Sequence, residues 1–129
     1  MSISQLQNID TNIIEFGFHS YMHRDYKHLS NEDIKNDFDA CKNIIIENNL
    51  KVYPSLAYPY GSYPKTKLEN TNFKLQLEKN EIKFGLRIRN RPNKFPFKKN
   101  YEIQRIDVKG EENLLKFKYK INFNHIIKL

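Results

Sequence analysis

The sequence predicts an α/β fold, because segments patterned as strands alternate with a segment patterned as a helix. The helix signal covers 31–48, where Ser30 and Asp33 have the spacing of a capping box. Behind this cap, apolar residues recur every three or four positions at Ile34, Phe38, Cys41 and Ile45. Segments rich in β-branched and aromatic residues predict strands on both sides of the helix, over 12–18 and 52–58.

The second half of the chain continues the alternation. The charged, proline-free composition of 65–80 favours a helix, and alternating apolar residues over 84–90 predict a strand with one buried face. A short strand is expected over 103–108 and a terminal helix over 111–119. Parallel strands joined by helices collect functional residues at their carboxyl ends, where His19 and Tyr60 lie.

Composition limits the class of protein. With 129 residues, 39% of them hydrophobic, we expect a single domain over 1–129. No apolar run has the length of a membrane span or a signal peptide, so a cytoplasmic location is the default expectation. Cys41 is the one cysteine, and we expect it in the core. The net charge of +7 suits polyanions, but the lysines alternate with acidic and apolar residues, which favours a solvated surface over a nucleic-acid site.

His19 and His23 are four residues apart. If Ser20 begins a helical turn, both imidazoles lie on one side and can share a divalent ion. Histidines at this spacing also occur by coincidence on surfaces and loops, so the pair by itself leaves both interpretations open.

The order of the motifs adds information. The run His-Ser-Tyr-Met-His-Arg-Asp-Tyr at 19–26 precedes the capped helix, and the next strand ends in Ala-Tyr-Pro-Tyr-Gly at 57–61. This arrangement resembles the second and third motifs of NodB-type polysaccharide deacetylases, and the similarity continues through 85–88 and 101–110. These enzymes, of carbohydrate esterase family four, use an irregular (β/α) barrel and a divalent metal, commonly zinc, to deacetylate N-acetylated sugars. The resemblance therefore implies a partial barrel of this type, a zinc cofactor, and an N-acetylated polysaccharide or glycan as the partner.

The resemblance also implies roles for individual residues. His19 and His23 would be metal ligands, and the backbone N–H of Tyr60 would be the oxyanion donor. Pro59 and Gly61 would fix that turn. Substrate contacts would come from this segment, with aromatic stacking on pyranose rings by Tyr21, Tyr58 and Tyr60.

Three features of the family pattern are missing. The first motif, a Thr-Phe-Asp-Asp strand end that supplies a metal ligand and the general base, has no counterpart, since only 18 residues precede His19. Loss of a general base typically lowers the rate by about 10²–10⁴, so we expect very poor unaided hydrolysis. Ala57 replaces an arginine found in many relatives, and Arg105 is a candidate for its electrostatic role or else a solvated strand charge. The late general acid is not recognisable, because His125 fits a tail residue.

Three functions remain in competition. The first is a metal-dependent carbohydrate N-deacetylase, or one half of a split enzyme completed by an N-terminal half. The second is a non-catalytic, glycan-binding remnant of such an enzyme, and the third is a nucleic-acid-binding module supported by charge alone. An incomplete barrel would leave a sheet edge uncovered, so we also expect self-association or a complementing partner.

Overall fold

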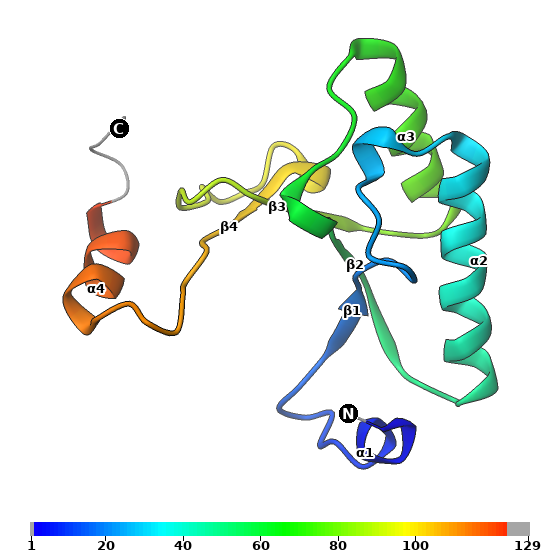
Figure 1. The fold of residues 1–129 in the computed structure, drawn as a ribbon, viewed down its shortest axis with the longest axis horizontal. Helices are drawn as coiled ribbons and strands as arrows, with labels where there is room; N and C mark the ends of the chain where they lie inside the picture. Colours follow the sequence, from blue (N-terminus) through cyan, green and yellow to red (C-terminus); the bar gives the residue numbers. More distant parts are fainter. Residues whose placement is uncertain (1, 124–129) are drawn as a thin grey trace.

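The computed structural model describes residues 2–123, and its centre is a four-stranded parallel sheet (Figure 1). The strands follow one another in chain order across the sheet: β1 (Phe16–Phe18), β2 (Val52–Ala57), β3 (Phe84–Ile88) and β4 (Ile103–Arg105). Neighbouring strands are parallel throughout. The α/β prediction is confirmed, and the sheet is open, as expected of a partial irregular barrel.

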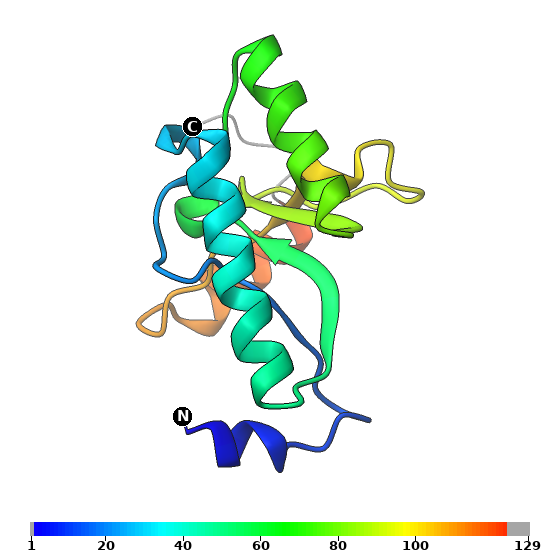
Figure 2. The same cartoon turned by 90° about the vertical axis from the view of Figure 1, so that its right-hand side faces the viewer.

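Two helices cover one face of this sheet. They are α2 (Asn31–Glu47) and α3 (Lys67–Lys79), which contact each other and lie together in front of the strands in Figure 2. Ser30 forms the predicted capping box, because its side chain accepts from the Asp33 N–H while the Asp33 carboxylate accepts from the Ser30 N–H. Both helices were predicted from the sequence, and both are confirmed.

The core lies between these helices and the sheet. It consists of nine buried residues, and the largest of them are aromatic. They are Tyr26, Ile34, Phe38, Leu56, Tyr58, Tyr63, Phe73, Leu77 and Ile82. The core thus anchors the segments that immediately follow β1 and β2, where the candidate site lies.

Two short helices flank the sheet, α1 (Ile3–Gln7) at the N-terminal end and α4 (Leu114–Phe123) at the other. Figure 1 shows α4 apart from the sheet, joined to it by an extended segment. It begins three residues later than predicted, because a turn occupies the positions after Gly110. No helix within residues 2–123 combines the length and the apolar character needed to cross a membrane.

Three strand predictions need correction. The strand predicted over 12–18 begins only at Phe16, because a turn closed by Asp10 precedes it and leaves Ile13 80% exposed. The strand over 103–108 ends at Arg105. The buried face predicted for β3 is wrong, since Ile88 is exposed and the buried residue is Gly85 on the opposite face. Cys41 is only half-buried, and His125 lies outside the described residues.

Candidate functional site

The predicted site residues come together at the carboxyl ends of β1 and β2. His19 directly follows β1, and the 3₁₀ turn Pro59–Gly61 follows β2. The Nδ1 of His19 lies 2.7 Å from the carbonyl oxygen of Ala57. A carbonyl can only accept, so Nδ1 carries the proton and a neutral His19 presents an unprotonated Nε2.

The two imidazoles converge on each other. The Nε2 atoms of His19 and His23 are 3.2 Å apart. Two nitrogens bound to one tetrahedral zinc at about 2.0–2.1 Å each would be separated by about 3.3 Å, so this pair has the spacing of two ligands of a single ion. The sequence predicted that a helical turn would bring the two rings together. That prediction is wrong, because Ser20 and His23 have left-handed φ values of 70° and 52°.

A buried carboxylate, Asp37 on α2, holds the loop that carries the histidines. It is 4% exposed, and its Oδ1 accepts from the Ser20 hydroxyl at 2.9 Å and from the Tyr21 N–H at 3.0 Å. Its Oδ2 accepts from the Tyr26 hydroxyl at 2.7 Å. Burial, and then the contact with Asp37, raise the pKa of Tyr26 above its ordinary value, which keeps this hydroxyl a donor. The loop between His19 and Tyr26 is therefore tied to α2 at both ends.

The turn after β2 presents a free backbone donor. Tyr60 has φ 56° and ψ 8°, and no acceptor within residues 2–123 is bonded to its N–H. Its ring, 68% exposed, lies edge-on to His23 with 4.9 Å between centroids. Gly61 has φ 65°, and an added Cβ would collide with the backbone of Ile88, so the turn requires glycine there. The geometry leaves the Tyr60 N–H available to a ligand beside the histidines.

Arg105 reaches this turn from β4. Its Nη2 donates to the carbonyl oxygen of Tyr58 at 2.9 Å, and burial lowers the pKa of its guanidinium. The arginine thus contacts the backbone next to the free N–H of Tyr60 and is not a solvated strand charge. Its contact positions the turn.

The aromatic residues differ in their access to a sugar. Tyr21 and Tyr60 are more than half exposed. The prediction that Tyr58 stacks on a sugar ring is wrong, because this ring is fully buried and its hydroxyl donates to the Tyr101 carbonyl. Pro59 is buried as well. Tyr58 and Pro59 therefore shape the turn from beneath.

The donor set fits a metal only in part. His19 and His23 supply two nitrogens, but residues 2–123 contain no cluster of three or more histidine, cysteine or carboxylate side chains that could hold an ion. A catalytic zinc ordinarily has three protein ligands. One ligand must come from outside the described residues if this is such a centre.

Two site features were missed from the sequence. The first is Asp37, which is three residues after Ile34 and four before Cys41, on the face of α2 that was predicted to be buried. A carboxylate on a buried face indicates that hydrogen-bond donors lie close to it. The Ala57 carbonyl, which orients His19, leaves no signal in the sequence because every residue has one.

Comparison with known proteins identifies a family for the chain. The sequence model of the family described as polysaccharide deacetylase matches residues 3–76. The matched span contains both histidines and the Pro59–Gly61 turn, and it ends before Arg105. No curated protein and no solved structure gives a significant match. Because the family model covers more than half of the chain, the chain belongs to the polysaccharide deacetylase family, which implies a polysaccharide substrate and a deacetylase-like function.

Proposed function

We propose that this chain carries part of the centre of a metal-dependent carbohydrate N-deacetylase, with His19 and His23 as ligands of a divalent ion, zinc in the first instance. The observation behind this proposal is the 3.2 Å separation of their Nε2 atoms beside the free N–H of Tyr60. The reaction would add the oxygen of water to the acetyl carbon and break the C–N bond. The products are acetate and an amine, which takes up a proton.

Each residue has a distinct task in this scheme. The bound ion would polarise the acetamide carbonyl as a Lewis acid. The Tyr60 N–H would donate to the oxygen that becomes negative as the acetyl carbon turns tetrahedral. Arg105 holds the Tyr58 carbonyl, in the peptide unit just before the one that carries this N–H, and so supports the turn. Tyr21 and Tyr60 offer exposed rings to the sugar.

The missing carboxylate requires a further segment, and the edge of β1 is the place for it. Within residues 2–123, β1 pairs only with β2. A cavity of about 440 Å³ lies along this strand, lined mainly by apolar side chains of β1 and α2 and by His19. A parallel strand added at this edge would end beside His19, where a carboxylate could be the third ligand and a second one the general base. Without it, the chain is expected to bind zinc weakly and to be inactive alone.

A second candidate function is a glycan-binding remnant without catalysis. The observation that favours it is the lack of a third potential ligand within residues 2–123. The exposed rings of Tyr21 and Tyr60 would then bind sugar without turnover, and chelators would have no effect.

Zinc calorimetry on the purified chain separates the two functions. We expect weak binding of one ion per chain that is lost in His19→Ala and in His23→Ala. His28→Ala is the matched control, because His28 is exposed and faces Asp25 at 3.9 Å, outside the pair. A chain that binds zinc should gain deacetylase activity on an N-acetylated oligosaccharide when a polypeptide with the Thr-Phe-Asp-Asp strand is supplied. No zinc binding, or equal binding by all three variants, would leave the remnant as the function.

A further inference from the structure

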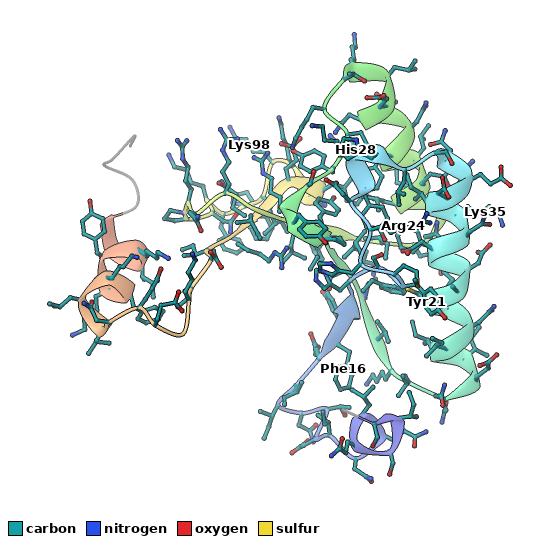
Figure 3. All side chains as sticks on the ribbon, in the orientation of Figure 1. Phe16, Tyr21, Arg24, His28, Lys35 and Lys98 are labelled. Carbon is teal, nitrogen blue, oxygen red and sulfur yellow. The ribbon has the colours of Figure 1, made fainter. Side chains whose placement is uncertain are left out.

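A second concave site lies on the far side of β3, between the loop 91–99 and β4. The pocket has a volume of about 620 Å³, within the range of ligand sites. Figure 3 shows Lys98 on this loop, away from α2 and its labelled Lys35. Neither the family match nor the histidine site includes it, since the match ends at residue 76.

The loop is built into the sheet. The Asn93 side chain donates to the Gln104 carbonyl at 2.8 Å and accepts from the Gln104 N–H at 2.9 Å, as a neighbouring strand would. Phe97 packs against Phe95 and Phe84, with ring centroids 4.2 and 6.4 Å away. The pocket wall is thus held by hydrogen bonds between the Asn93 side chain and the backbone of β4 and by aromatic packing.

The lining of this pocket is strongly cationic. Five of its residues are basic and one is acidic: Arg87, Arg91, Lys94, Lys98 and Lys99 against Glu102. Ion pairs at 3.3, 3.4 and 3.7 Å connect Glu102 to Arg87, Lys74 and Lys99. Burial opposes the charged carboxylate, but Lys99, Arg87 and Lys74 outweigh it and hold the pKa of Glu102 below its ordinary value.

The remaining cations are left for a ligand. Within residues 2–123, Arg91, Lys94 and Lys98 form no ion pair. Arg87 is 15% exposed, and its buried Nε–H has no acceptor. Like charges gathered in a concave site focus the potential, so an anion gains more here than on an open surface.

The pocket is connected to the proposed active site through β3. The Tyr60–Gly61 turn rests on Ile88, and its neighbour Arg87 is part of the pocket wall. Phe95, 79% exposed, adds an apolar ring of the kind on which a sugar can stack. A polysaccharide at the histidines could therefore extend over this pocket, whereas a nucleic acid would need a longer basic groove.

We propose that this pocket binds a carboxylate of an acidic polysaccharide, so that the substrate class is a glycan containing both N-acetylhexosamine and uronic acid. The assignment of the glycan as substrate rests on the proposed function, while the pocket's affinity for it does not.

The test is titration of the full chain with a hyaluronan octasaccharide and with its carboxyl-reduced form, at 50 and 300 mM salt. We expect tighter binding of the acidic form, weakened by salt. The Arg91→Gln/Lys98→Gln variant should bind the acidic octasaccharide more weakly, by about fivefold for each positive charge removed, as expected for unit charges about 4 Å apart in water. The carboxyl-reduced form should bind the variant and the natural chain equally.

Lys67→Gln/Lys79→Gln is the matched control, because it removes two exposed charges from α3. Equal losses in both double variants, or equal affinity for the two octasaccharides, would overturn the proposal, and so would no binding at all. A single-stranded oligonucleotide that binds more tightly, with the same dependence on the loop, would assign the pocket to nucleic acid instead. Acidic-glycan binding that persists in His19→Ala, in a chain that fails the zinc test, would support the pocket and reject the deacetylase.

Discussion

Asp37→Ala should remove the tie between α2 and the histidine loop. The three donors that lie within 3.0 Å of the carboxylate lose their acceptor: the Ser20 hydroxyl, the Tyr21 N–H and the Tyr26 hydroxyl. Water can reach the first two, because Ser20 is half-buried and Tyr21 exposed, so each costs about the net value of a hydrogen bond, ~1 kcal/mol. Tyr26 is fully buried, and its unpaired hydroxyl costs about 1–3 kcal/mol. The free energy of unfolding should fall by about 3–5 kcal/mol.

Two further variants separate the loss of the Asp37 hydrogen bonds from the loss of its side-chain volume. Asp37→Asn keeps Oδ1 as an acceptor and lets the Tyr26 hydroxyl accept from the new amide, so we expect a loss of only about 1 kcal/mol. Adding Tyr26→Phe to Asp37→Ala deletes the orphaned hydroxyl and should recover about 1–2 kcal/mol.

Urea denaturation of the four chains measures these differences, and zinc calorimetry on Asp37→Asn reports on the histidines. The reasoning is refuted if Asp37→Ala unfolds within about 0.5 kcal/mol of the natural chain. It is refuted equally if Tyr26→Phe destabilises the Asp37→Ala chain further, since the hydroxyl would then have a partner other than Asp37.

Three other predictions follow from single positions. Gly85→Ala should lower the free energy of unfolding by about 1–3 kcal/mol, because the new methyl overlaps the Tyr58 hydroxyl, while Gly110→Ala, with open space around it, should change it by less than about 0.5 kcal/mol in the same urea assay. The pKa of Glu102 is lowered in the fold, so its contribution to the free energy of unfolding is complete above the unfolded pKa of about 4.5 and is lost as pH falls through the folded pKa. Urea denaturation between pH 7 and pH 3 should show this loss of stability, and Glu102→Gln should make the stability depend less on pH. Burial raises the pKa of Cys41 to about 11, so iodoacetamide at pH 8 should alkylate it about twentyfold more slowly than in urea, and equal rates would contradict the burial.

The sequence predicted those elements whose signals are local. The capping box of Ser30 and Asp33 placed the start of α2, and the Pro59–Gly61 turn closed β2 where expected. Motif order was also sufficient to indicate the family that residues 3–76 match. Strand limits were less predictable, because Ile13 is β-branched and apolar yet is 80% exposed, with no neighbouring element to bury it.

The sequence by itself therefore determined the α/β alternation and the family, and it identified His19 and His23 as candidate ligands. Tertiary structure decided how those histidines meet. Their Nε2 atoms converge because Asp37 and Tyr26 hold the loop with left-handed conformations at Ser20 and His23, which cost energy in L-residues. The cationic pocket likewise depends on packing, since Asn93 brings its loop against β4. Contacts between residues distant in the chain set these geometries, and spacing along the sequence does not encode them.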